Sequence, residues 1–152
     1  MTKILFVCHG NICRSPMAEY VMKDLVRQSG REDEFVIASA ATSREELGNP
    51  VYPPARRKLA EHGIRCDGHA ARQMTHKDYE EFGYLIGMDR MNLSNMARIC
   101  GGDPEGKCSL LLAHAGQSGD VADPWYTGDF EATWQDVNIG CRALLKELTE
   151  KK

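Results

Sequence analysis

The sequence has no long hydrophobic run, no excess of basic charge and few aromatic residues. Its longest apolar stretches, such as residues 110–113, are too short to cross a bilayer, and no stretch resembles a signal peptide. The formal net charge of −3 argues against nucleic acid as a partner. Internal repeats and low-complexity segments are also absent. We therefore expect a compact cytoplasmic protein that does not associate with membranes.

The cysteines and histidines indicate neither a disulfide framework nor a metal site. Six cysteines in a chain of 152 residues without a secretion signal are better read as reduced thiols. His62, Cys66 and His69 are close in sequence, but a fourth metal ligand at a recognisable spacing is missing. Cys100 and Cys108 flank a glycine-rich turn and could form a redox pair. We expect neither metal nor cofactor.

Apolar runs and helical patterns alternate along the chain. Strands are predicted at residues 4–7, 35–38, 84–88 and 109–112, and helices from Pro16 onward, at 55–62, after the cap-like Thr75, at 90–100 and at 130–150. Strands separated by helices predict an α/β fold. We expect a single domain over residues 1–152, with a four-stranded parallel sheet, helices on both faces and ligand at the carboxyl ends of the strands. The long polar loop at residues 42–54 is expected to line that site.

One segment near the start has the layout of a cysteine that attacks phosphate. The eight residues from position 8 read Cys-His-Gly-Asn-Ile-Cys-Arg-Ser, between the expected strand at 4–7 and a helix with Pro16 at its first position. Backbone N–H groups at a helix N-terminus lack intrahelical partners, so they bind anions and favour a thiolate at Cys8. Arg14 offers a planar fork for two phosphoryl oxygens, and Gly10 permits a close approach of the backbone.

A second segment, Asp-Pro-Trp-Tyr at residues 123–126, follows the last expected strand and can reach the same edge of the sheet. Asp123 is a candidate general acid, because protonation eases the departure of a tyrosyl oxygen, and the same carboxylate can then activate water. Pro124 would stiffen the acid, while Trp125 and Tyr126 would wall a slot for an aryl phosphate. Asp-Pro is also common in turns, so a purely structural role stays open.

Over nearly its whole length the chain resembles the low-molecular-weight protein tyrosine phosphatases. The resemblance rests on VCHGNICRSP at residues 7–16, the Asp-Pro-aromatic-Tyr motif, and shorter segments at 39–43, 48–50, 69–73 and 88–89. It implies metal-independent hydrolysis of phosphotyrosine in proteins, with inorganic phosphate as product, by a monomer or weak dimer. Cys8 would be the nucleophile, Arg14 the phosphate ligand and Asp123 the general acid.

The resemblance extends to the residues around these three. Phosphate and substrate are expected to contact His9, Gly10, Asn11, Ile12, Cys13, Ser15, Trp125 and Tyr126. Ser15 would donate a hydrogen bond to the thiolate, and Asn11, Ser39 and His69 would hold the loop in shape, although ordinary capping and loop hydrogen bonds explain these residues nearly as well. Cys13 matches a cysteine that can pair with Cys8 under oxidation.

Two positions depart from the family pattern. An aromatic residue often precedes Gly48 in the family, whereas this chain has Arg-Glu-Glu-Leu at residues 44–47. Glu45 and Glu46 make the rim more acidic, so we expect a weaker preference for acidic phosphopeptides. His9 stands where leucine is common, and its partner is not readable from the sequence.

Three other functions remain open at this point. Protein arginine phosphatases are near neighbours of the family, but that branch tends to have threonine where this chain has Ile12. Arsenate reductases share the fold and would use a pair such as Cys100 and Cys108, yet they carry a further cysteine where this chain has Gly-Met-Asp at residues 87–89. A phosphate-binding module without turnover would need neither a thiolate nor Asp123.

Overall fold

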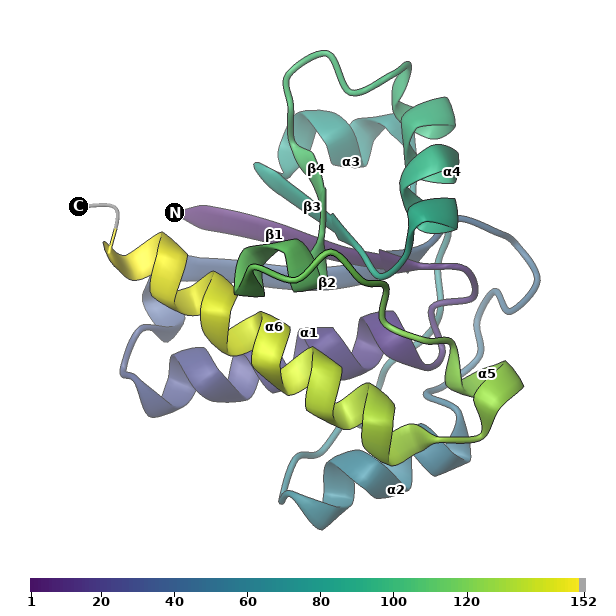
Figure 1. Cartoon of the computed structure of the whole chain (residues 1–152), viewed down its shortest axis with the longest axis vertical. Helices are drawn as coiled ribbons and strands as arrows, with labels where there is room; N and C mark the ends of the chain where they lie inside the picture. Colours follow the sequence, from purple (N-terminus) through teal and green to yellow (C-terminus); the bar gives the residue numbers. More distant parts are fainter. Residues whose placement is uncertain (151–152) are drawn as a thin grey trace.

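A single parallel sheet organises the chain, as the alternation of strands and helices predicts. The computed structural model describes residues 1–150, and its four strands are ordered β2-β1-β3-β4 (Figure 1). The strands are β1 (Thr2–Cys8), β2 (Phe35–Ala41), β3 (Tyr84–Gly87) and β4 (Cys108–Leu110). The first strand in sequence therefore lies in the interior of the sheet, and the loop that follows it opens at the carboxyl edge.

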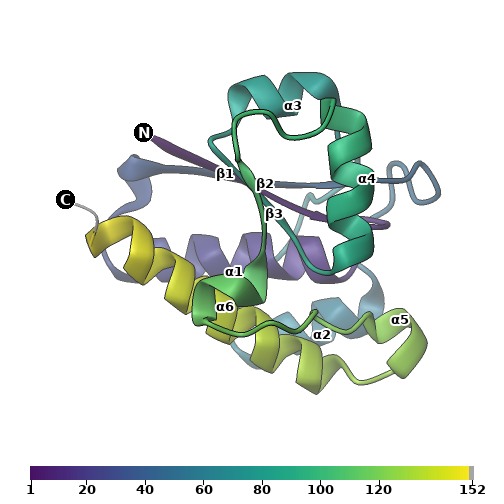
Figure 2. The same cartoon turned by 45° about the horizontal axis from the view of Figure 1, so that its top comes forward.

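Helices cover both faces of this sheet. The α-helices are α1 (Arg14–Gln28), α2 (Pro53–Glu61), α3 (His76–Glu81), α4 (Arg90–Cys100), α5 (Pro124–Thr127) and α6 (Phe130–Glu150), and the short 3₁₀ helices are η1 (Glu32–Glu34) and η2 (Leu111–Ala115). Figures 1 and 2 show α1, α2 and α6 on one face and α3 and α4 on the other. The predicted α/β class and the four-stranded parallel sheet are confirmed.

The side chains of β1 separate the hydrophobic core into two halves. Ile4 and Phe6 pack into the cluster that includes α1 and α6, whereas Leu5 and Val7 pack into the cluster with α3 and α4. Successive side chains of a strand point to opposite faces, so a strand covered on both sides must be apolar at every position. The continuous apolar run at residues 4–7, which predicts a buried strand, fits this interior place in the sheet.

Several expected boundaries differ from the structure by one to three residues, and the differences at α1 and β4 have a local physical reason. Helix α1 begins at Arg14, so Pro16 occupies the third helical position instead of the first, still within the turn where a backbone N–H has no intrahelical acceptor. Strand β4 ends at Leu110, and the apolar residues Leu111 and Leu112 belong to η2. The short helix α5 was not predicted. Thr75 does begin α3, where it forms a capping box with Asp78.

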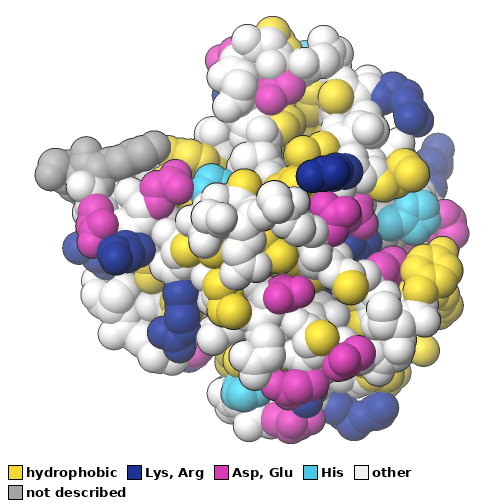
Figure 3. Space-filling model, viewed as in Figure 1, with side chains coloured by type: hydrophobic (Ala, Val, Ile, Leu, Met, Phe, Trp, Pro, Cys, Tyr) yellow, Lys and Arg dark blue, Asp and Glu magenta, His cyan; other side chains and the backbone are white. Residues whose placement is uncertain are grey.

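The surface of residues 1–150 carries both signs of charge. Figure 3 shows Lys and Arg side chains interspersed with Asp and Glu over the face it presents. Within the same residues, no helix is both long and apolar enough to cross a bilayer.

Candidate active site

The loop between β1 and α1 wraps around the sulfur of Cys8. The backbone N–H groups of Asn11 and Ser15 donate hydrogen bonds to Cys8 Sγ over 3.3 and 3.4 Å, and Ser15 Oγ lies 3.0 Å from the same sulfur. The first turn of α1 contains no acidic side chain, and no side chain caps its N-terminus. Two backbone donors converge on the sulfur at a helix N-terminus, an arrangement that favours an anion there.

Asn11 holds the loop in this conformation. It is fully buried and has a φ of 60°, in the left-handed region that asparagine tolerates better than most residues. Its side-chain amide donates to Ser15 Oγ (2.8 Å) and Ser39 Oγ (2.9 Å), and its carbonyl oxygen accepts from the Arg72 backbone (3.2 Å). His69 Nε2 lies 2.8 Å from the Asn11 backbone oxygen. Asn11, Ser39 and His69, which were expected to hold the loop in shape, thus form one network that also includes Ser15.

Arg14 is buried and fixed by three acceptors. Nη1 donates to Asp89 Oδ2 (2.7 Å) and to the backbone oxygen of Val121 (2.9 Å), while Nη2 lies 3.5 Å from Asp123 Oδ2. Burial alone would lower the pKa of Arg14, but the charges of Cys8, Asp89 and Asp123 outweigh it and raise that pKa above its ordinary value. The guanidinium therefore keeps its charge at every accessible pH, and its orientation is set before any ligand arrives.

Asp123 lies across the cavity from the loop between β1 and α1, residues 9–13, which is called the phosphate loop below. It is the N-cap of α5, where its Oδ1 accepts from the backbone N–H of Trp125 (3.0 Å). The Trp125 ring packs against the Tyr52 ring with centroids 4.9 Å apart, whereas Tyr126 is 85% exposed. The carboxylate is thus held by a short helix that also places two aromatic side chains at the entrance.

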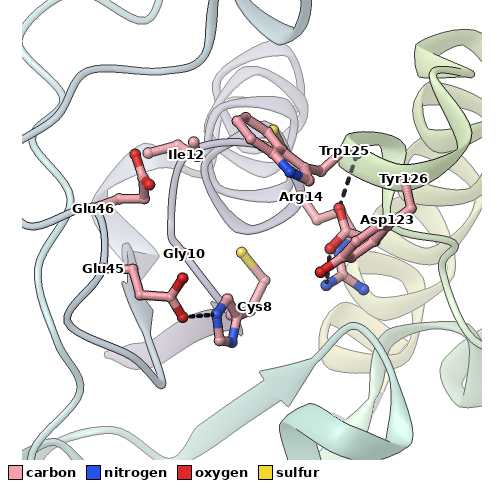
Figure 4. A pocket seen from close by; sticks show the side chains of 11 residues that line it. Cys8, Gly10, Ile12, Arg14, Glu45, Glu46, Asp123, Trp125 and Tyr126 are labelled. Atoms are coloured by element: carbon pink, nitrogen blue, oxygen red, sulfur yellow. Dashed lines mark hydrogen bonds and ion pairs between the residues drawn. The ribbon is translucent and has the colours of Figure 1, made fainter.

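These groups surround a cavity of about 130 Å³ (Figure 4). Its lining residues are Cys8, His9, Gly10, Ile12, Cys13, Arg14, Glu45, Glu46, Asp123, Trp125 and Tyr126. A thiol at the base, a fixed cation and a carboxylate on the opposite wall can hold a phosphoryl group for nucleophilic displacement. Six of the eight residues expected to contact phosphate or substrate line this cavity, whereas Asn11 and Ser15 are fully buried and do not line it.

Comparison with known proteins agrees with this geometry. A family model described as low molecular weight phosphotyrosine protein phosphatase matches residues 3–152. The chain belongs to the low-molecular-weight protein tyrosine phosphatases. The resemblance found in the sequence is thereby confirmed, and membership of the family makes the chain a hydrolase of the protein-tyrosine-phosphatase class.

Relatives of known structure match the whole fold. A low molecular weight protein-tyrosine-phosphatase of Bacillus subtilis, YfkJ, is 38% identical, with 100% of this chain and 99% of the relative aligned. The crystal structure of YfkJ has a TM-score of 0.96 and covers 100% of this chain and 97% of its own. The crystal structure of a Drosophila arginine phosphatase is 26% identical, with a TM-score of 0.91 and coverage of 99% and 100%.

Three contacts of this phosphatase site were not predicted from the sequence. Asp89 makes the shortest of the three hydrogen bonds of Arg14, His9 pairs with Glu45, and Tyr52 packs against Trp125. The position of Asp89 could have been predicted from the sequence, because it follows β3 and caps α4 and therefore lies at the carboxyl edge of the sheet. The other two contacts join distant loops, and nothing local in the sequence indicates them.

Two other cysteines, Cys13 and Cys108, differ in how close they lie to Cys8. Cys13 lines the cavity, and burial, followed by the charge of Cys8, raises its pKa to about 12, so it stays a thiol at neutral pH. Cys108 on β4 pairs with Leu85 on β3, and Leu85 pairs with Leu5 on β1. Cys108 is therefore two strands away from β1, at the level of a residue three positions before Cys8. Standard strand spacings make this separation roughly 14 Å. Within residues 1–150, no cluster of His, Cys, Asp and Glu could hold a metal ion.

Proposed function

We propose that this chain hydrolyses phosphotyrosine in proteins through a cysteinyl-phosphate intermediate. Cys8 Sγ attacks phosphorus, the bond from phosphorus to the tyrosyl oxygen breaks, and Asp123 gives its proton to that oxygen. Water then attacks the intermediate and gives a proton to Asp123 as the sulfur–phosphorus bond breaks, which releases inorganic phosphate. The observation that carries this proposal is the thiol of Cys8, facing Asp123 across a cavity and held by two backbone N–H donors.

Arg14 supplies the charge that this reaction needs. Phosphoryl transfer spreads negative charge over the non-bridging oxygens, and a planar guanidinium can bind two of them at once. Because Asp89 and Val121 already fix the guanidinium, little entropy is lost when phosphate binds. Trp125 and Tyr126 at the entrance suit an aromatic leaving group.

The deciding experiment compares phosphotyrosine and phosphoarginine peptides side by side in the presence of a chelator. We expect wild type to turn over phosphotyrosine, Cys8→Ser to abolish turnover, and Asp123→Ala to lower kcat by roughly 10²–10⁴-fold. The loss in Asp123→Ala should shrink for an aryl phosphate with an acidic phenol, because that leaving group needs no proton. Equal losses for all leaving groups would contradict the role of Asp123.

Arginine phosphatase activity is the second candidate, since the Drosophila arginine phosphatase has the same fold. Ile12 lines the cavity of this chain with an apolar side chain, which favours the flat face of a tyrosyl ring. A higher kcat/KM for phosphoarginine than for phosphotyrosine would keep the chemistry and overturn the substrate.

Arsenate reduction is disfavoured by the position of Cys100 and Cys108. The register of the sheet separates Cys108 from Cys8 by roughly 14 Å, too far for direct thiol–disulfide exchange. We expect the variant with both Cys100→Ser and Cys108→Ser to keep phosphatase activity. If wild type reduced arsenate with thioredoxin and this variant did not, the chain would be an arsenate reductase that uses Cys100 and Cys108.

Reversible oxidation is a further part of the proposal. Hydrogen peroxide would convert the Cys8 thiolate to a sulfenic acid with release of hydroxide, and attack by the Cys13 thiol on that sulfur would form a disulfide and release water. Both residues line the same cavity. After peroxide treatment, we expect a reductant to restore wild-type activity fully and Cys13→Ser activity only in part. Recovery that is independent of Cys13 would contradict this step.

A further inference from the structure

Two carboxylates from the loop after β2 stand at the mouth of the cavity. Glu45 and Glu46 both line it, on the side opposite Asp123 and Tyr126 (Figure 4). A peptide whose phosphotyrosine reaches Cys8 must place its neighbouring residues beside this rim. The charge that each carboxylate presents there depends on its own partners.

Glu45 is engaged by the phosphate loop. Its Oε2 lies 2.5 Å from Nε2 of His9, and its backbone N–H donates to Ser43 Oγ (3.3 Å). Ser43 in turn donates to the backbone oxygen of His9 through both its N–H (3.1 Å) and its hydroxyl (2.8 Å). One carboxylate oxygen of Glu45 is therefore occupied by the His9 ring.

Glu46 has no such partner. Its Oε1 accepts a hydrogen bond from the neutral amide of Asn49 (2.9 Å), and no cation of residues 1–150 lies within ion-pair distance. Its stem packs against the phosphate loop, because a Cβ placed on Gly10 would lie 3.3 Å from Glu46 Cγ. The side chain is thus positioned beside the loop with an uncompensated negative charge.

From these contacts we propose that Glu46 selects phosphotyrosine peptides with Lys or Arg beside the phosphotyrosine and rejects those with Asp or Glu there. The inference rests on the proposed function and names the substrate class of the same site. At physiological salt, charges interact over about 8 Å, and an extended chain advances roughly 3.3–3.6 Å per residue. Selection should therefore be confined to the one or two positions on either side of the phosphotyrosine.

The test uses phosphotyrosine peptides that differ only in having Lys, Gln or Glu at these flanking positions. We expect wild type to prefer the Lys peptide over the Glu peptide by about 10-fold in kcat/KM, a difference of about 1.4 kcal/mol. Glu46→Gln keeps the shape and the hydrogen bond to Asn49, and should reduce this ratio to about 2-fold. Glu45→Gln should change it less, because His9 already engages that carboxylate.

Glu105→Gln is the matched control, since it removes the same charge from the exposed turn before β4. It should leave the ratio at the wild-type value. A ratio near one in wild type, or a ratio that Glu46→Gln leaves unchanged, would overturn the inference. A ratio that Glu105→Gln lowers as much as Glu46→Gln would assign the preference to net charge and would also overturn it.

Binding separates this inference from the proposed chemistry. Fluorescence anisotropy gives the dissociation constants of the three peptides for Cys8→Ser. These constants measure how the residues at the mouth of the cavity affect peptide binding when no turnover occurs. If wild type hydrolyses none of the peptides while Cys8→Ser still ranks Lys over Glu, the proposed function fails and the selection by Glu46 stands. If wild type hydrolyses the peptides efficiently but neither kcat/KM nor the dissociation constants differ between the Lys and Glu peptides, the proposed function stands and the selection by Glu46 fails.

Discussion

At the scale of single residues, Asn11 combines a conformational and a chemical task. Its backbone is in the left-handed region, and its side chain bonds to Ser15, Ser39 and the backbone of Arg72. A non-glycine residue without asparagine's local hydrogen bonding would adopt this φ at a cost of about 1–2 kcal/mol. The same residue thus gives the loop its shape and holds the hydroxyl that faces the Cys8 sulfur.

Two substitutions at Asn11 separate these tasks. Asn11→Gly relieves the backbone and loses the side-chain bonds, whereas Asn11→Ala loses the bonds and retains the strain. We expect both variants to lose about 10-fold or more in kcat/KM toward an aryl phosphate, because Ser15 loses the donor that orients it. Urea unfolding should show Asn11→Ala to be the less stable of the two by about 1 kcal/mol. Equal or reversed stabilities would show that the left-handed backbone is unstrained.

At the scale of elements, the contact between η2 and α6 fixes how the last helix lies on the sheet. A Cβ added to Gly140 in α6 would lie 2.4 Å from Cγ of Leu111, which is itself fully buried. The glycine therefore allows a close approach between the helix and the segment that follows β4. This segment continues to Val121 and Asp123, so the packing also bears on the site.

We predict that Gly140→Ala destabilises the protein although alanine is the better helix former. The gain in helix propensity is about 1 kcal/mol, while overpacking a core typically costs 1–3 kcal/mol and here involves three atoms of Leu111. Thermal and urea unfolding should show a net loss of stability. Leu111→Val should destabilise the wild type but recover part of the loss in Gly140→Ala. If Gly140→Ala stabilised the protein instead, Leu111 and η2 would have to move away from the added methyl group at little cost in free energy.

The same contact explains one limit of prediction from the sequence. Ser109 and the three leucines at 110–112 fit a buried strand, but the packing of Leu111 against α6 ends β4 at Leu110. The run at 4–7 and the helix at 130–150 could be predicted because local pattern and tertiary burial agree there. In the site, Cys8, Arg14 and Asp123 belong to local motifs, whereas the pairing of His9 with Glu45 depends on two loops meeting in space.

At the scale of the whole molecule, buried thiols link stability to alkaline pH. Burial raises the pKa of Cys13 and of Cys108 from 9.0 to about 12 and raises that of Cys141 as well. Above pH 9 the unfolded chain loses these protons while the folded chain keeps them. The folded state then binds more protons than the unfolded state, so its stability falls as pH rises.

We therefore expect the free energy of unfolding to be nearly independent of these thiols below pH 8 and to fall between pH 9 and 12. Each thiol contributes a slope of up to about 1.4 kcal/mol per pH unit. Urea unfolding at a series of pH values measures this slope. Cys141→Ser, which removes one titrating group and keeps a donor to the Ala18 oxygen, should show a shallower slope than wild type. Identical slopes would mean that Cys141 does not contribute.

The order of the strands has a consequence for how the site arises during synthesis. The central strand β1 and the loop around Cys8 leave the ribosome before Asp123, and Asp123 leaves before α6, the helix that packs on α1. At roughly 5–20 residues per second, a nascent chain carries the thiol for about ten seconds before the carboxylate emerges. During that interval the proposed nucleophile would lack its proposed proton donor, so a truncated translation product that retained the phosphate loop would bind a phosphate monoester and cleave it only slowly.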